Sequence, residues 1–313
     1  MRDILRRLVA GDLTEEEAVA ELRRFQLDEL GGRAKLDLGR FMRRGIPEVV
    51  LATGKAPADA ARLAIAMAER QGQGLISRMS DAHKAALQDA AGAAGMQVVG
   101  YASSARVVRP GFAPEAIECK VGILTAGTSD LPAAEEAKMV VEACGVQVRL
   151  HADLGVAGLH RFVGPLASTL EWGAEVIIVA AGMDGVLPGL VAGLIDVPVI
   201  GLPVSTGYGR GGAGEAALTT MLQSCSTGLV VVNIDNGVGA GAAAVLIAQR
   251  RLRGRTVATI AKTSAASKSA PTTIGKTARH MSTPPGTAKV SASTTTTKKT
   301  AASSHGKPRR GRP

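Results

Sequence analysis

The second half of the chain alternates continuous apolar runs with segments in which apolar residues recur at helical spacing. Runs rich in Val, Ile and Leu, such as VGILT, are typical of strands buried on both faces of a parallel sheet. The pattern predicts five such strands, at 120–127, 146–151, 175–182, 198–204 and 229–233. It predicts helices at 132–144, 157–170, 214–224 and 239–252, and a short helix ending at Gly193. We therefore predict an α/β domain of three layers, α/β/α, around a parallel sheet.

The first half of the chain has a weaker pattern. Thr14 and Glu17 form a T-x-x-E capping box, which predicts a helix over 14–24. The stretch 35–44 is a second amphipathic candidate, so we expect helices throughout 1–45. From there the pattern predicts strands at 48–52, 75–79 and 97–102, helices at 57–71 and 81–94, and a linker bracketed by Pro110 and Pro114. The expected organisation is a smaller N-terminal α/β domain at 1–116, the three-layer domain at 117–253 and a tail at 254–313.

Polar, glycine-rich loops follow all five predicted strands of the second half. In parallel sheets, ligands bind beyond the carboxyl ends of the strands. Five such loops on one edge therefore predict a ligand site there. The candidate binding residues in these loops are Gly127, Thr128, Ser129, Asp130, His160, Arg161, Gly182, Met183, Ser205, Gly207, Tyr208 and Gly209.

The first and fourth loops each have two interpretations. Gly127 lets the backbone approach a ligand, and the N–H groups at the start of the following helix suit an anion. Ser129 or Asp130 could equally serve only to cap that helix. The glycine-rich segment 207–212 is either a mobile flap over a ligand or a flexible connection.

Four candidate residues each have a chemical and a structural interpretation. A single cysteine such as Cys225 is more often a small buried hydrophobe than a nucleophile. Asp184 is either an acid or base, or the residue of a glycine-flanked turn. His160 and Arg161 either pair with phosphate or lie on a surface turn. No His, Cys or Asp cluster has the spacing of a zinc site, so we expect no structural metal.

The charge of the chain is concentrated at its end. The net charge is +10, from 37 Lys and Arg against 27 Asp and Glu, and 12 of these cations lie in 254–313, which has no acidic residue. The tail is rich in Ala, Ser, Thr, Lys and Pro, so its composition predicts disorder. Its spaced cations also suit nucleic acid or another polyanion. The tail lacks aromatic residues, which gives no support for base stacking.

The cysteines and the hydropathy pattern limit the setting of the protein. The chain has three cysteines, at 119, 144 and 225, which form no CxxC pair and are too few for a disulfide framework. No apolar run approaches the ~18 residues of a membrane span. The charged, amphipathic N-terminus does not have the pattern of a secretory signal. We expect a cytoplasmic protein.

Five long motifs stand out in the second half: GTSDLPAAEEA (127–137), DLGVAGLHR (153–161), AAGMDGVLPGLVAGLIDVPVIGLPVSTGYG (180–209), LQSCSTG (222–228) and VVNIDNGVGAGAAA (231–244). Together they resemble the LarB family of nickel-pincer nucleotide cofactor biosynthesis. The resemblance covers 1–252, and LDLGRFMRRGIPEVV (36–50) is similar to the first domain of that family. The C-terminal part of the family in turn resembles PurE, the aminoimidazole ribonucleotide carboxylase or mutase, which implies a PurE-like or flavodoxin-like fold.

The resemblance implies a reaction of nicotinic acid adenine dinucleotide with CO2 or bicarbonate. The products would be pyridinium-3,5-dicarboxylate mononucleotide and AMP. Cys225 matches the family nucleophile, and Asp184 stands where the family has a glutamate, with a side chain one methylene shorter. Ser129 and Asp130 would hold the ribose or phosphate region, and the other candidate residues would surround the substrate. The resemblance implies a homo-octamer without a tightly bound cofactor, and leaves open whether Mg²⁺ assists.

Two other functions compete with this one. The first is a PurE-type enzyme acting on aminoimidazole ribonucleotide. That family's S-A-H-R-T-P segment is absent here, and His151-Ala152-Asp153 and His160-Arg161 stand near its place. PurE also needs neither Cys225 nor an additional N-terminal domain. The second is a non-catalytic nucleotide-binding protein with a polyanion-binding tail, which would have no use for Cys225 and Asp184 together.

Overall fold

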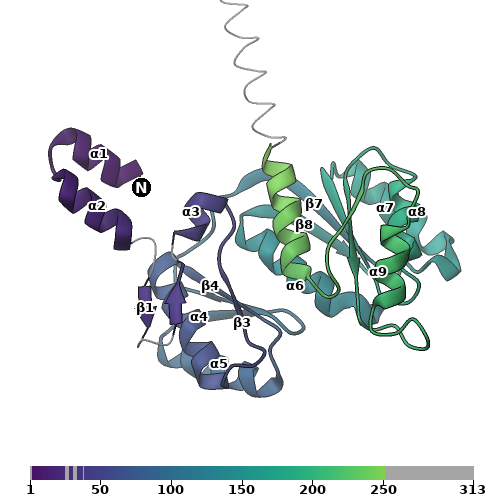
Figure 1. Cartoon of the computed structure of the whole chain (residues 1–313), viewed down its shortest axis with the longest axis horizontal. Coiled ribbons are helices and arrows are strands. Elements are labelled where there is room, and N and C mark those ends of the chain that lie inside the picture. Colours follow the sequence, from purple (N-terminus) through teal and green to yellow (C-terminus); the bar gives the residue numbers. More distant parts are fainter. Residues whose placement is uncertain (1, 25–27, 31–33, 38, 251–313) are drawn as a thin grey trace, which may run out of the picture. The chain divides into compact units, whose positions relative to one another are not determined.

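The computed structural model describes residues 2–24, 28–30, 34–37 and 39–250, and contains sheets of two, four and five strands (Figure 1). The tail predicted at 254–313 lies outside the described residues. The five-stranded sheet has the order β11-β10-β9-β7-β8, and every pairing in it is parallel, which confirms the predicted parallel sheet. Its strands are β7 (Ile117–Thr125), β8 (Val146–His151), β9 (Val176–Ala181), β10 (Val199–Pro203) and β11 (Leu229–Val231).

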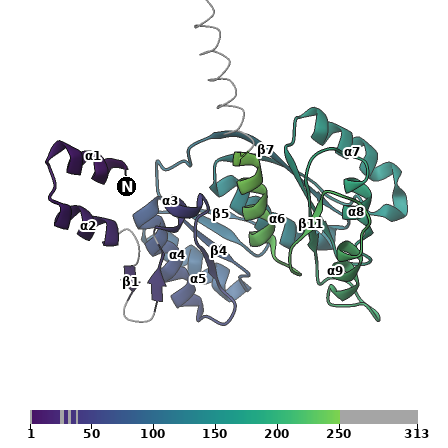
Figure 2. The same ribbon diagram turned by 45° about the horizontal axis from the view of Figure 1, so that its top comes forward.

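Helices cover both faces of this large sheet because successive residues of a strand point to opposite sides. Ile178 of β9 packs in one core cluster, and its neighbour Ile177 packs in another. The first cluster includes α6 (Leu131–Ala143) and the helix at 237–250; the second includes α7 (His160–Glu171), α8 (Val186–Ala192) and α9 (Glu215–Leu222). Figures 1 and 2 show these two groups of helices on opposite sides of the sheet. The predicted three-layer α/β/α fold is confirmed.

The four-stranded sheet of the N-terminal part is mixed. Its order is β3-β4-β6-β5, in which β3 and β4 are parallel and the other two pairings are antiparallel. The strand β6 was not predicted, because its four residues lie immediately before the proline-bracketed linker. The elements are β3 (Val49–Leu51), α4 (Pro57–Gln71), β4 (Gln73–Ser77), α5 (Asp81–Ala93), β5 (Gln97–Gly100) and β6 (Ala105–Val108).

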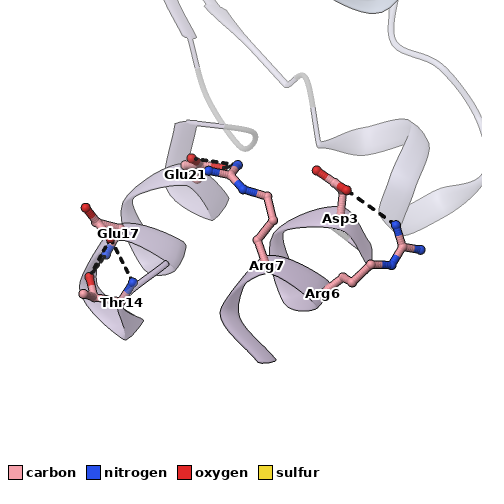
Figure 3. Close-up of polar contacts among 6 residues, drawn as sticks. All are labelled: Asp3, Arg6, Arg7, Thr14, Glu17 and Glu21. Atoms are coloured by element: carbon pink, nitrogen blue, oxygen red, sulfur yellow. Dashed lines mark hydrogen bonds and ion pairs between the residues drawn. The ribbon is translucent and has the colours of Figure 1, made fainter. Parts of the chain in front are cut away.

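The first two helices, α1 (Arg2–Ala10) and α2 (Glu15–Arg24), form a hairpin held by polar contacts (Figure 3). The Thr14 N–H donates to the Glu17 carboxylate at 2.8 Å, and the Glu17 N–H donates to Thr14 Oγ1 at 3.2 Å. These are the two halves of a capping box, so the predicted start of this helix is confirmed. Hydrogen bonds from the Thr14 backbone and side chain lower the pKa of Glu17. Arg7 pairs with Glu21 at 3.2 Å and joins the two helices.

The prediction of a helix over 35–44 is wrong. Ala34–Leu36 is a strand, β2, which pairs antiparallel with β1 (Asp28–Leu30), and only Arg40–Arg44 is helical, as α3. Gly31-Gly32 between two short strands is a hairpin signal that outweighs the amphipathic spacing. Gly45, with a φ of 70°, ends α3 after five residues.

The N-terminal part has a hydrophobic core cluster of its own and also contributes to one cluster of the C-terminal part. Ile46 and Leu75 belong to the same buried cluster as Val121 and Ile178 of the large sheet. Across the same boundary, the Gln73 side chain donates from Nε2 to the Ala143 carbonyl at 2.8 Å. The coil at 109–116 lies between β6 and β7, where the domain boundary is predicted. The described residues accordingly belong to one compact unit.

The described helices are short. The longest that begins and ends within the described residues, α4, has 15 residues, whereas a bilayer span needs about 20 apolar residues. In the part of the chain that the structure describes, no helix has the length and apolar character to cross a membrane.

Candidate functional site

The loops after the strands of the large sheet are tied to one another at its carboxyl edge. Thr206 Oγ1, after β10, donates to Asp130 Oδ1, after β7, at 3.0 Å. The Ser205 N–H donates to Asp235 Oδ1, after β11, at 2.9 Å. These two hydrogen bonds join the loops that follow β7, β10 and β11. The polar loops of three of the five strands therefore meet, as the sequence predicts.

Asp130 is the buried centre of this network. Its residue is 3% exposed, and Oδ2 accepts the Gly127 N–H at 2.8 Å while Oδ1 accepts from Thr206. Burial raises the pKa of the Asp130 carboxyl, and these two hydrogen bonds oppose the rise. The side chain makes no capping bond to α6. Asp130 therefore shapes the loop rather than simply closing a helix end.

Gly182, after β9, is in close contact with the same network. A Cβ atom built on Gly182 would lie 2.2 Å from Thr206 Oγ1 and 2.9 Å from Asp130 Oδ1. Gly207 is equally constrained, since its Cβ would lie 2.4 Å from the Gly182 carbonyl oxygen. The loops after β7, β9 and β10 can thus approach one another only because Gly182 and Gly207 have no side chain.

A cavity of about 320 Å³ opens beside this network. Its lining comes from both parts of the chain, since residues after β4 and between β5 and β6 face residues after β7, β10 and β11. The polar residues of the lining are Arg78, Ser103, Ser129, Glu136, Ser205, Thr206 and Asp235.

Cys225 lies in a second, separate groove. This groove, of about 530 Å³, is formed by α8, α9 and the segment that follows α9. Cys225 is an exposed free cysteine, so the alternative of a small buried residue does not apply to it. Ser226 Oγ donates to the Gly189 carbonyl at 2.7 Å and joins the cysteine segment to α8.

The loop between β9 and α8 connects the cavity network to the groove. Gly182 at its start contacts Asp130 and Thr206, and Gly185 at its end lines the groove of Cys225. Asp184 lies between them and is exposed, and its Oδ1 accepts the Val186 N–H at 3.2 Å. Asp184 thus forms a turn at the start of α8. It directly precedes Gly185, which lines the cysteine groove.

Two family models match the sequence one after the other. Residues 27–117 match the LarB/PurE-like N-terminal domain, and residues 120–269 match AIR carboxylase. An uncharacterised protein of Methanocaldococcus jannaschii is 39% identical over 254 residues, which cover 80% of this chain and 97% of that protein. The chain belongs to the LarB/PurE-like carboxylase family. The motif resemblance predicted from the sequence is thereby confirmed at the level of the family.

Other relatives match a smaller part of this LarB/PurE-like protein. The N5-carboxyaminoimidazole ribonucleotide mutase of Thermotoga maritima is 30% identical over 131 residues, 41% of this chain and 74% of that protein. The mutase of Pyrococcus horikoshii is 32% identical over 127 residues, 41% of this chain and 71% of that protein. The crystal structure of a PurE2 variant from Treponema denticola covers 47% of this chain and 98% of its own, with 18% identity and a TM-score of 0.35.

The predicted site residues of this LarB/PurE-like protein do not all meet at one place. Ser129 and Ser205 line the cavity, and Gly127 and Gly182 support it. Cys225 lines the other groove, and the two sets of lining residues have no member in common.

The remaining predicted residues lie at the exposed sheet edge. Arg161 pairs through Nη1 with Asp153 Oδ2 at 3.1 Å, which fits the surface-turn interpretation of this pair. Apart from Asp184 and the network residues Gly127, Asp130, Gly182 and Gly207, the predicted residues that line neither the cavity nor the groove are Thr128, His160, Arg161, Met183, Tyr208 and Gly209.

Sequence reasoning missed the contribution of the N-terminal part to the cavity. Arg78 lies directly after β4, whereas the strand was predicted to run to residue 79 and so to include it. Glu136 was passed over as one residue of a helix, although it is 4% exposed and faces the cavity. The signal available was that Arg78 follows a strand of the β3–α4–β4 unit, where a ligand-binding loop is expected.

The accessibility of the three cysteines gives a direct prediction. Cys119 and Cys144 are buried, and burial raises the pKa of the Cys144 thiol to about 12. Because the thiolate is the reactive form, we expect iodoacetamide to modify Cys225 alone in the native protein and all three cysteines in urea. Peptide mass mapping identifies the modified cysteines. Labelling of Cys119 or Cys144 in the native protein at a rate comparable to that of Cys225 would contradict the burial of these two thiols.

A resident metal site is not built into the described part of the chain. No three His, Cys, Asp or Glu side chains are grouped there so as to hold a metal ion.

Proposed function

We propose that this protein carboxylates the pyridinium ring of nicotinic acid adenine dinucleotide and hydrolyses its phosphoanhydride, giving pyridinium-3,5-dicarboxylate mononucleotide and AMP. The observation that carries the proposal is the exposed Cys225 in a groove next to the Asp184 loop. A ring carboxylation of this kind needs an accessible nucleophile, and carboxylase chemistry is that of the family.

The chemistry explains why a thiol is needed. A pyridinium ring is electron-poor and does not attack CO2. Addition of the Cys225 thiolate to the carbon beside the ring nitrogen gives a dihydropyridine with a nucleophilic enamine carbon. That carbon bonds to CO2, a base removes the proton from it, and expulsion of the thiolate restores the aromatic ring. This is covalent catalysis, in which one difficult step is divided into easier ones. Hydrolysis then adds water across the phosphoanhydride and releases AMP.

We assign the roles of the other residues from their positions. Asp184, at the edge of the cysteine groove, is the proposed base. Ser129 and the loop held by Asp130 take the ribose or phosphate region. His160 and Arg161 neutralise phosphate or carboxylate, and the segment 207–212 closes over the ring. The residues that complete the substrate contacts are Gly127, Thr128, Gly182, Met183, Ser205, Gly207, Tyr208 and Gly209.

The setting proposed for the enzyme follows the family. CO2 or bicarbonate is the co-substrate, no cofactor is tightly bound, and the protein acts in the cytoplasm as a homo-octamer. Because the cavity and the cysteine groove are distinct within one chain, neighbouring copies in the octamer are proposed to complete each site.

The test is one mass-spectrometric assay. Purified protein is incubated with nicotinic acid adenine dinucleotide and ¹³C-bicarbonate, with and without Mg²⁺. A labelled dicarboxylated mononucleotide together with AMP is the expected result. The comparison between the two arms shows whether Mg²⁺ assists the hydrolysis. Intact dinucleotide without AMP in both arms would overturn the proposal.

The second candidate function is that of a PurE-type enzyme on aminoimidazole ribonucleotide. It is favoured by the two relatives named as N5-carboxyaminoimidazole ribonucleotide mutases. It gives no role to Cys225 or to the N-terminal part. The same assay with aminoimidazole ribonucleotide and labelled bicarbonate tests it, and label in that nucleotide alone would favour this candidate.

A further inference from the structure

The cavity of about 320 Å³ lies where the carboxyl ends of two sheets meet. Arg78 follows β4 of the N-terminal sheet, and Ser129, Ser205 and Asp235 follow β7, β10 and β11 of the large sheet. The strands β3 and β4 are parallel and joined through α4, so they form a βαβ unit. Ligand-binding loops in such units lie at the carboxyl ends of the strands. Both parts of the chain therefore present this kind of loop to one space.

Arg78 is the cationic residue in the lining of this cavity. Its Nη2 donates to the Asp235 carbonyl at 2.6 Å, and its Nε lies 4.0 Å from Glu136 Oε1. The side chain is still 45% exposed, and Nη1 has no partner among the described residues. The guanidinium is thus held in position through Nη2 and Nε, while Nη1 stays available for a ligand.

The backbone at this contact is in an uncommon conformation on both sides. Arg78 has a φ of 54° and Asp235 a φ of 55°, in the left-handed region that favours glycine. Non-glycine residues in this region cost free energy and cluster at functional sites. With the backbone in this conformation, the Arg78 side chain crosses the boundary between the two parts of the chain and reaches Asp235.

The carboxylates of the lining already have hydrogen-bond donors. Glu136 Oε2 accepts the Val238 N–H at 3.1 Å, at the start of the helix 237–250. Asp235 Oδ1 accepts the Ser205 N–H. The hydroxyl groups of the lining that are not already donating are those of Ser103, Ser129 and Ser205. A guanidinium with nearby hydroxyl donors is the set that recognises phosphate oxygens.

We propose that Arg78 binds a phosphate of the nucleotide, so that the N-terminal part supplies an anion-binding group of the site in addition to those of the C-terminal part. The volume of the cavity lies at the lower end of the range for small-molecule pockets, which suits one nucleotide half. This proposal rests on the proposed function in one respect only, that the substrate is a phosphate-bearing nucleotide. It assigns the N-terminal part to substrate binding.

The experiment compares ligands with and without phosphate on the full-length chain. Calorimetry gives the affinities of AMP against adenosine and of nicotinic acid mononucleotide against its riboside. In Arg78→Ala we expect the preference for the phosphorylated member of at least one pair to fall about 10- to 100-fold, the range for a hydrogen bond to a charged group. The affinity for the unphosphorylated member should stay within about twofold, since the phosphate contact alone is removed.

Matched variants separate binding from a structural role. Arg62→Ala removes an exposed arginine of α4 that pairs with Asp59 at 2.9 Å, and should leave both preferences unchanged. Arg78→Lys should keep part of the preference, and Arg78→Gln, which removes the charge but keeps a polar side chain, should lose it. If both members of each pair lose affinity equally, Arg78 only joins the two parts and the proposal is overturned. It is also overturned if the wild-type protein shows no preference for phosphate or if Arg78→Ala keeps it.

The outcomes also separate this proposal from the proposed function. The binding measurements need no turnover. If the wild-type protein fails to carboxylate nicotinic acid adenine dinucleotide but shows a phosphate preference that depends on Arg78, the proposed function fails and the Arg78 proposal stands. If turnover is normal and Arg78→Ala alters neither the preference nor KM, the Arg78 proposal alone fails.

Discussion

The variant Cys225→Ser is expected to lose carboxylation by about 1000-fold or more, because removal of a covalent nucleophile costs an enzyme most of its rate. A hydroxyl is a far weaker nucleophile than a thiolate at neutral pH, so the ring would not be converted to its enamine form. Binding of the dinucleotide should survive, since serine is close to cysteine in size and Cys225 lies at an exposed groove. The labelled-bicarbonate assay gives the rate, and calorimetry gives the affinity.

The control for this result is Cys144→Ala. Cys144 is buried, and its Sγ lies 3.7 Å from the Gly45 carbonyl oxygen, away from the groove. We expect this variant to lose some stability and to keep its rate per folded molecule. Full carboxylation by Cys225→Ser would show that the reaction does not pass through a cysteine adduct.

The variant Gly74→Ala is expected to lower the free energy of unfolding by about 3 kcal/mol, at the upper end of the range for an overpacked core. A Cβ at Gly74 would lie 2.0 Å from the Ala64 carbonyl oxygen, which belongs to the backbone of α4. A backbone atom cannot rotate aside as a flexible side chain does, so α4 must separate from β4. Every residue of β4 is buried, so the separation affects the core. Urea unfolding followed by circular dichroism measures the change.

Gly92→Ala is the matched control in the same part of the chain. Gly92 lies in α5, and nothing stands within 4 Å of the position that its Cβ would take. Alanine favours a helix over glycine by about 1 kcal/mol, so this variant should be as stable as the wild-type protein or more so. If Gly74→Ala unfolds within about 1 kcal/mol of the wild type, the strand and the helix are not packed as tightly as described.

The large sheet could be predicted from the sequence because its signals are local. Its strands are continuous apolar runs of β-branched residues, and each is followed by a helix with its own spacing. The same runs placed the polar loops at one edge, including the pair Ser129 and Asp130. The polarity of these loops could be read from the sequence. The hydrogen bond from Thr206 to Asp130 could not, because 76 residues separate the two.

The parts that were missed depend on pairing between segments. The strands β1, β2 and β6 have three or four residues each, too few for a periodicity to show, and they are strands because of their partners. The contact from Arg78 to Asp235 spans 157 residues. Cys225 was expected to share a site with Ser129, but α9 lies between the loop after β10 and the cysteine and carries the cysteine into a different groove.

The core that the two parts share limits how a substrate can enter. Rotation of the N-terminal part about the coil at 109–116 would expose Ile46 and Leu75, which are 5% and 0% exposed. Exposing two such side chains costs about 3–6 kcal/mol, so a hinge motion of this kind would be rarely populated. The cavity should therefore keep its lining from both parts of the chain while a ligand enters.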